Sequence, residues 1–232
     1  WIEVLTKWMV DFHSETITHY SYENENTKNI ISSRLNMAEE IDNVLGTNLL
    51  ISIKEKLKYI QKLDMSIPIG FIHGDLSPIN IIFNDANDYY VIDWEDANIA
   101  DCAIDDFCNM IFSFGVRLRI NNVLSRNKYL FLISKLVRKI FKKHKSYDNM
   151  IGLEDYTFYD DKNLSLSFEK AWSLYADGIG IEKSIINWWV YLYLIKYAHL
   201  ELSLSRNNIN KCKSWVNLFN NMITNDVKIY RE

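Results

Sequence analysis

The sequence predicts an α+β fold that is mainly helical, with one short β region in the first half of the chain. Apolar residues recur at three- and four-residue spacings over most of the 232 residues, as on the buried face of a helix. The exception is segment 66–97, which is rich in β-branched and aromatic residues with turn formers at its joints. With 48% hydrophobic residues, the chain is able to bury one sizeable core.

Two helical regions are expected before this β region. The apolar rhythm of Ile2, Leu5, Met9 and Phe12 predicts an amphipathic helix from residue 1 to about residue 20. The polar stretch 21–33 is expected to form a surface loop. Helical spacing resumes from residue 34 to about residue 63, and Gly46 predicts a break between two helices there.

Helices are expected again beyond residue 105, over 107–118, 129–144, 167–179 and 184–204. The longest strongly apolar run, 188–195, is far shorter than the ~20 residues that span a bilayer, so no membrane span is expected. Several aromatic residues here are expected mostly in the core, with some in reach of a ligand: Trp172, Trp188, Trp189, Tyr191 and Tyr193.

Charge and cysteine content exclude other classes. A net charge of −4 gives no general electrostatic reason for binding nucleic acid, and the basic face over 135–145 is expected to be solvated. Cys102, Cys108 and Cys212 are odd in number and lack CxxC spacing, so neither a disulfide framework nor a zinc site is indicated. Reduced thiols in the cytoplasm are the expectation.

The chemistry-bearing stretch runs from residue 73 to residue 93. Strands over 79–83 and 89–93 are expected to form a hairpin, with the turn formers 84–88 between them. A turn centred between residues 86 and 87 places Asn80 opposite Asp93, with Cβ atoms roughly 4.5 to 5.5 Å apart. Their amide and carboxylate oxygens suit Mg²⁺. Asp75, on the loop that enters the first strand, is the candidate base for a hydroxyl.

This segment of the sequence resembles a known family. The spacing HxDxxxxN, followed by a hairpin and a second Asp, is similar to the catalytic and magnesium loops of the protein-kinase-like fold. More narrowly, HGDLSPINII with VIDWEDANIADCAIDDF resembles the aminoglycoside phosphotransferase and choline kinase family. The start of the chain resembles that family's helix after the interlobe hinge.

The resemblance implies that residues 1–232 form the C-terminal lobe of a kinase-like enzyme. Residues 66–115 would be its catalytic core, and 116–232 a helical subdomain that binds the acceptor. It implies Asp75 as base and Asn80 and Asp93 as ligands of Mg²⁺ and the nucleotide, ATP or GTP. His73 and Asp105 would support the catalytic loop. The activity implied is phosphoryl transfer to a hydroxyl of a small molecule.

Two questions stay open at the sequence level. The residues before His73 read as helix and contain neither a Gly-rich loop nor a strand-borne Lys. The nucleotide-binding lobe is therefore expected upstream in a longer protein, and this stretch alone is expected to be inactive. A pseudokinase or ligand-binding scaffold is the alternative. The motif does not choose among aminoglycosides, choline-like alcohols and sugars; acids that would suit a cationic acceptor are Glu154, Asp155, Asp160, Asp161, Glu169 and Asp177.

Overall fold

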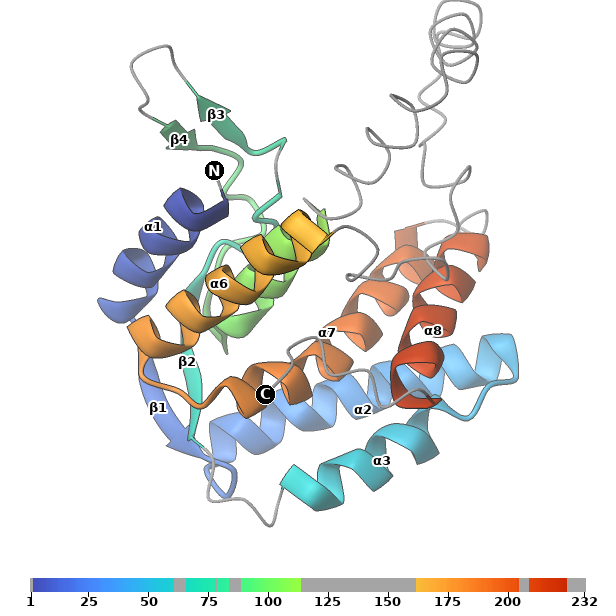
Figure 1. Cartoon of the computed structure of the whole chain (residues 1–232). Coiled ribbons are helices and arrows are strands. Elements are labelled where there is room, and N and C mark those ends of the chain that lie inside the picture. The colour runs from blue at the N-terminus through green and yellow to red at the C-terminus, as the bar shows by residue number, and fades with distance from the viewer. Residues whose placement is uncertain are drawn as a thin grey trace, which may run out of the picture.

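The computed structural model describes residues 2–60, 66–77, 79–83, 89–113, 162–204 and 209–224. Helices dominate, and the described strands form two small antiparallel sheets, so the mainly helical α+β class is confirmed (Figure 1). In chain order the elements are α1 (Ile2–Ser14), β1 (Thr18–Ser21), α2 (Glu25–Leu45), α3 (Leu49–Ile60), β2 (Ser66–Ile72), β3 (Ile81–Phe83), β4 (Tyr89–Val91), β5 (Asn98–Cys102), a helix over 104–113, α6 (Lys162–Ile179), α7 (Lys183–Leu204) and α8 (Ile209–Thr224).

The first sixty residues differ from expectation in two respects. The stretch 21–33 was expected as a loop, but α2 begins inside it, at Glu25, with Asn24 as N-cap accepting from the backbone N–H of Asn26 at 2.9 Å. The buried face of this first part of α2 includes Thr27 as well as Ile31, so the apolar rhythm is weak there. Residues 18–21, expected as the end of the first helix, instead form β1.

The break near Gly46 is confirmed. This glycine caps α2 with a φ of 68° and donates its N–H to the carbonyl of Asp42 at 2.8 Å. Such a left-handed conformation is what ends a helix at glycine, because a side chain would be strained there. A second helix, α3, follows at Leu49, as predicted.

Strand β2 is the centre of the larger sheet and leads into the loop of interest. It pairs antiparallel with β1 on one side and with β5 on the other, and its middle residues are buried. The chain leaves β2 at Ile72 and enters the loop at His73. The sheet therefore fixes where that loop starts.

Helix α7 organises the helical body. It is apolar on nearly all sides, as a helix buried in a core requires, and it packs on α2, α3, α6 and α8. Figure 1 shows it crossing the middle of the molecule, with α1 and α6 lying side by side. Of the aromatic residues expected in the core, Trp172, Trp189, Tyr191 and Tyr193 are buried, and Trp188 is partly buried.

Some expectations fall on residues outside the described ranges. These are the helix over 129–144, the basic face over 135–145, and the acids Glu154, Asp155, Asp160 and Asp161. Within the described ranges, no helix is long and apolar enough to cross a membrane. Cys102, Cys108 and Cys212 are all buried free thiols.

Candidate functional site

The loop between β2 and β3 holds itself in shape through short-range hydrogen bonds. The carbonyl of Asp75 accepts from the backbone N–H of Ser77 at 2.8 Å, and the carbonyl of Ser77 accepts from that of Asn80 at 3.0 Å. Gly74 has a φ of 86°, and a Cβ there would collide with the carbonyl oxygen of Asp96. The loop therefore passes so close to the segment after β4 that only glycine fits at this position.

His73 lies fully buried at the entrance to this loop and touches both ends of the motif. Its Nδ1 accepts from the backbone N–H of Asp75 at 3.3 Å, and its Nε2 donates to the carbonyl of Ile92 at 2.9 Å. The imidazole ring also lies 4.5 Å from the ring of Trp94. His73 thus joins the loop to the backbone beside Asp93, which is where a residue that supports the loop has to be.

The carboxylate that holds the loop backbone is that of Asp106. Its Oδ2 accepts from the N–H of His73 at 2.7 Å and its Oδ1 from the N–H of Gly74 at 2.9 Å. His13 of α1 lies between this carboxylate and Tyr175 of α6, with Nε2 3.3 Å from Asp106 Oδ2 and Nδ1 2.8 Å from the tyrosine oxygen. The sequence assigned the supporting role to Asp105, so the structure moves it by one residue along the helix.

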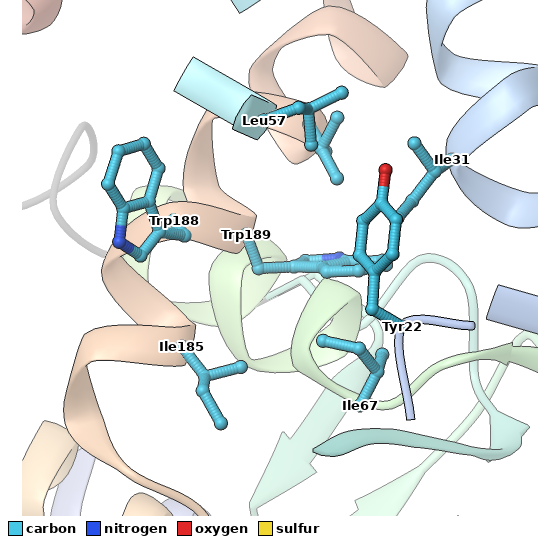
Figure 2. Close-up of a pocket in the computed structure, with 8 residues that line it drawn as sticks. Tyr22, Ile31, Leu57, Ile67, Ile185, Trp188 and Trp189 are labelled. Carbon is cyan, nitrogen blue, oxygen red and sulfur yellow. The ribbon is translucent and has the colours of Figure 1, made fainter. Parts of the chain in front are cut away.

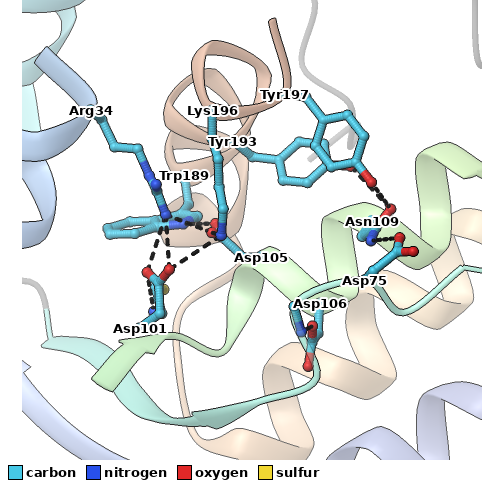
Figure 3. Close-up of polar contacts among 12 residues, drawn as sticks. Arg34, Asp75, Asp101, Asp105, Asp106, Asn109, Trp189, Tyr193, Lys196 and Tyr197 are labelled. Atoms are coloured by element: carbon cyan, nitrogen blue, oxygen red, sulfur yellow. Dashed lines mark hydrogen bonds and ion pairs between the residues drawn. The ribbon is translucent and has the colours of Figure 1, made fainter. Parts of the chain in front are cut away.

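Asp105 instead belongs to a buried charge cluster made by Arg34 of α2, Asp101 of β5 and Lys196 of α7 (Figure 3). Its Oδ2 accepts from Arg34 at 2.8 Å and from Lys196 at 2.7 Å, while its Oδ1 accepts from the indole N–H of Trp189 at 2.7 Å. Successive residues of one helix thus face different neighbours, because each step turns the side chain by about 100°.

This cluster stays ionised despite its burial. Burial alone would raise the pKa of Asp105, but the charges of Lys196 and Arg34 and the hydrogen bonds outweigh it and hold that pKa below its ordinary value. Burial likewise opposes the charge of Lys196, but the charges of Asp105 and Asp101 and the hydrogen bond to Asp105 together outweigh it, so the lysine pKa is raised. Two cations and two carboxylates therefore tie α2, β5, α7 and the helix over 104–113 together.

The side chain of Asp75 is held by two amides. Asn80 donates its Nδ2 to Asp75 Oδ2 at 3.0 Å and to the Asp75 carbonyl at 2.9 Å. Asn109, on the helix over 104–113, donates its Nδ2 to Asp75 Oδ1 at 3.2 Å. Asp75 and Asn80, which the sequence singled out, are therefore brought into direct contact. Asn109 was not foreseen, although a polar residue within the buried run Phe107 to Phe112 is a detectable signal.

The hairpin forms, but its register differs by one residue from the predicted one. Ile81 pairs with Val91 and Ile82 with Tyr90, so Ile92 rather than Asp93 lies across from Asn80. The N–H of Ile92 donates to the carbonyl of Asn80 at 2.9 Å, which continues this pairing. Asp93 follows one residue later, outside the ladder.

Asp93 has an uncommon, left-handed backbone conformation. Its φ is 66°, and it is the one described non-glycine residue with a positive φ. Aspartate tolerates this conformation better than most residues, yet it still needs surrounding contacts to persist. Those contacts come from Trp94, whose ring stacks on Phe71 at 5.9 Å and meets Phe12 of α1 edge-on at 5.6 Å.

Asn80 and Asp93 have oxygens to offer a metal ion. The described hydrogen bonds of the Asn80 side chain all use Nδ2, so its Oδ1 is left as an acceptor. Asp93 is exposed, and within the described ranges no hydrogen bond or ion pair involves its carboxylate. No group of three or more His, Cys, Asp or Glu side chains there would hold a metal. An amide oxygen with one carboxylate suits Mg²⁺, which commonly completes its shell with phosphate oxygens and water.

A small apolar pocket lies elsewhere, between α2, α3, α7 and β2 (Figure 2). Ile67, near the start of β2, is one of its walls, and six residues of extended strand put it about 20 Å from His73. Its lining offers no ionisable group beyond the tyrosine, so it does not serve the Asp75 loop. The residues are Tyr22, Ile31, Leu57, Ile67, Ile185, Trp188, Trp189 and Leu192.

Comparison with known proteins finds one family match that spans the loop and the hairpin. A family described as "Phosphotransferase enzyme family" matches residues 19–118, a segment that contains Asp75, Asn80, Asp93 and Asp106. The resemblance to the aminoglycoside phosphotransferase and choline kinase family is thereby confirmed for this segment, which is less than half of the chain. Neither the curated proteins nor the solved structures give a match.

Proposed function

We propose that this chain forms the catalytic lobe of an enzyme that transfers the γ-phosphoryl group of ATP or GTP to a hydroxyl of a small molecule. The observation that carries the proposal is the contact between Asp75 and Asn80, 3.0 Å from oxygen to nitrogen, in a loop whose backbone is fixed by Asp106. The family match over residues 19–118 supports phosphoryl transfer as the reaction class.

Asp75 is the base in this proposal. Each of its carboxylate oxygens already accepts one amide hydrogen, and a carboxylate has about four acceptor positions. Positions therefore remain for an incoming hydroxyl, which the carboxylate would orient and from which it would take the proton. Asp75 is only partly buried, so an acceptor has access to it.

Asn80 and Asp93 would hold the metal through Asn80 Oδ1 and the Asp93 carboxylate. When bound with a nucleotide, Mg²⁺ supplies positive charge against the phosphate oxygens. The chain's own contribution would be to restrain these two side chains: Asn80 donates its amide to the carbonyl of Asp75, and the residue after Asp93, Trp94, is held by aromatic packing on Phe71. Such positioning is the larger part of catalysis in phosphoryl transfer.

The acceptor is proposed only as a class, a small hydroxyl compound such as an aminoglycoside, a choline-like alcohol or a sugar. Of the acids named from the sequence for a cationic acceptor, Asp177 lies exposed on α6, and Glu169 of the same helix is partly exposed. The buried free thiols at Cys102, Cys108 and Cys212 suit a reducing compartment, and we place the enzyme in the cytoplasm.

The test is Mg²⁺-dependent release of ADP from ATP by the whole protein, with pooled aminoglycosides, choline, amino-acid alcohols and sugars as acceptors. Asp75→Asn is expected to lower acceptor-dependent turnover by about 10²- to 10⁴-fold, the usual contribution of a general base. Glu39→Gln, at an exposed acid on α2 that has no role in the proposal, is the control and should leave turnover unchanged.

A second assay distinguishes the proposed metal-binding role of Asp93 from the proposed role of Asp75 as base. Asp93→Ala should abolish Mg²⁺-dependent binding of a fluorescent ATP analogue, whereas Asp75→Asn should retain it. Equal turnover by wild type and Asp75→Asn would refute the base. Nucleotide binding without any acceptor-dependent turnover would favour the pseudokinase alternative.

A further inference from the structure

Asn109 is almost completely buried, with 1% of its surface exposed, and both the oxygen and the nitrogen of its side-chain amide form hydrogen bonds. It lies three residues after Asp106, so both side chains leave the same face of the helix over 104–113 one turn apart. Asp106 holds the backbone of the catalytic loop, whereas Asn109 reaches the side chain of Asp75 at 3.2 Å (Figure 3). One helix face thus contacts the loop twice.

The orientation of this amide is fixed by its other end. Its Oδ1 lies 2.7 Å from the hydroxyl of Tyr197, 3.1 Å from that of Ser113 and 3.4 Å from that of Tyr193. Hydroxyl groups that donate to Oδ1 leave Nδ2 on the side of the Asp75 carboxylate, where only a donor is favourable. The reverse orientation would set two acceptors against each other.

Tyr197 is suited to be the anchor. Burial, and then the nearby negative charge of Asp75, raise the pKa of its hydroxyl above the ordinary value, so the group keeps its proton and remains a donor. Figure 3 shows Tyr197 and Tyr193 approaching Asn109 from α7, while Asp75 lies on its other side. A continuous hydrogen-bonded path therefore runs from α7 through Asn109 to the proposed base.

We propose that Asn109, anchored by Tyr197, is a positioning residue that sets the direction of the Asp75 carboxylate for attack by the acceptor. This role rests on the proposed function. With Asn80 on Oδ2 and Asn109 on Oδ1, the carboxylate is restrained from rotating, and its remaining acceptor positions point in fixed directions. Removing Asn109 would leave the Asp75 carboxylate held at Oδ2 by Asn80 alone and thus less restrained.

The first experiment is a double-mutant cycle between Asn109→Leu and Asp75→Asn. The probe is release of ADP from MgATP with water as acceptor. Leucine has nearly the same shape and lacks both polar ends. Asn109→Leu is expected to lower kcat by about 10- to 100-fold, the range for a misplaced catalytic group, with KM for MgATP within about twofold of wild type.

The double variant decides the role. If Asn109 acts through Asp75, Asn109→Leu should cause no further loss in the Asp75→Asn background, because the group that it positions has already gone. An equal loss in both backgrounds would overturn the positioning role and leave a structural one. Undiminished turnover in Asp75→Asn alone would instead overturn the base assignment, and with it the proposed function.

Two further measurements guard against a variant that fails to fold. Tyr197→Phe removes only the anchoring hydroxyl and is expected to lower kcat by roughly threefold or more with little change in melting temperature, since Ser113 and Tyr193 remain. In ¹⁵N spectra, the side-chain NH₂ signals of Asn109 should shift in Asp75→Asn and stay in place in Asp177→Asn. Signals unmoved by Asp75→Asn would overturn the contact without any assay of activity.

Discussion

Replacement of Asp106 by Asn should loosen the loop over 73–80 while leaving the fold around it intact. The Asp106 carboxylate accepts one hydrogen bond at each oxygen from the loop backbone, at 2.7 Å from His73 and 2.9 Å from Gly74. An asparagine has a single acceptor oxygen and turns an NH₂ group toward the other donor. At least one of the two backbone N–H groups thus loses its partner.

The size of the effect follows from the kind of bond that is lost. A hydrogen bond to a charged group contributes about 1.5 to 3 kcal/mol, and every 1.4 kcal/mol is a factor of ten in an equilibrium. Local opening that exposes the amide of His73 or Gly74 should therefore become about 10- to 150-fold more frequent. Asp106 is 1% exposed, so screening by solvent does not reduce this figure substantially.

Amide hydrogen exchange followed by NMR measures this opening at each residue. Exchange at His73 and Gly74 should accelerate in Asp106→Asn relative to exchange at Leu192 in the core of α7, which reports opening of the whole fold. The matched variant is Asp105→Asn, whose described partners lie outside the loop. If Asp105→Asn accelerates exchange at His73 and Gly74 while Asp106→Asn does not, the assignment of the supporting carboxylate is refuted.

Three other outcomes are expected. Gly74→Ala should reduce turnover strongly because its Cβ meets backbone, whereas Gly46→Ala, with no atom within 4 Å of the added Cβ, should lower the free energy of unfolding by about 1 kcal/mol and spare turnover. The pKa of Asp105 is lowered on folding, so the contribution of its charge to the free energy of unfolding should be complete above the ordinary pKa of about 4 and be lost as pH falls below it. Urea unfolding from pH 2 to 7 should show this loss in wild type and a flatter profile in Asp105→Asn. Burial raises the pKa of Cys102 and Cys108, so iodoacetamide should label them only after unfolding, and rapid labelling of native protein would contradict their burial.

Much of this arrangement was accessible from the sequence. The motif from His73 to Asp93 marked the loop and the hairpin, because short strands and turn formers have strong local patterns. The register was not fixed by those patterns. Both strands are apolar along their length, so a shift of one residue leaves no polar side chain obviously on the wrong face. That is why Asp93 was placed in the ladder, whereas it lies just beyond it.

The choice between Asp105 and Asp106 shows a second limit. The two acids are adjacent, and the family pattern favoured the first. Only the packing of the helix over 104–113 decides which carboxylate turns toward the loop, and that packing depends on Arg34 and Lys196, which are distant in the sequence. The role of Asn109 was not predicted for the same reason, since its partners Asp75 and Tyr197 lie 34 and 88 residues away in the sequence.

The buried bonds of the helix over 104–113 make the site a product of the complete tertiary structure. Residues 19–118 contain every letter of the motif, yet His13 precedes this segment, and Lys196 and Tyr197 follow it. A piece of chain limited to those residues would contain the whole motif but would lack these partners. The loop over 73–80 is therefore expected to reach its described shape only when α1 and α7 have packed on the helix over 104–113. Under the proposed function, phosphoryl transfer would then begin only after the rest of this fold has formed around the loop.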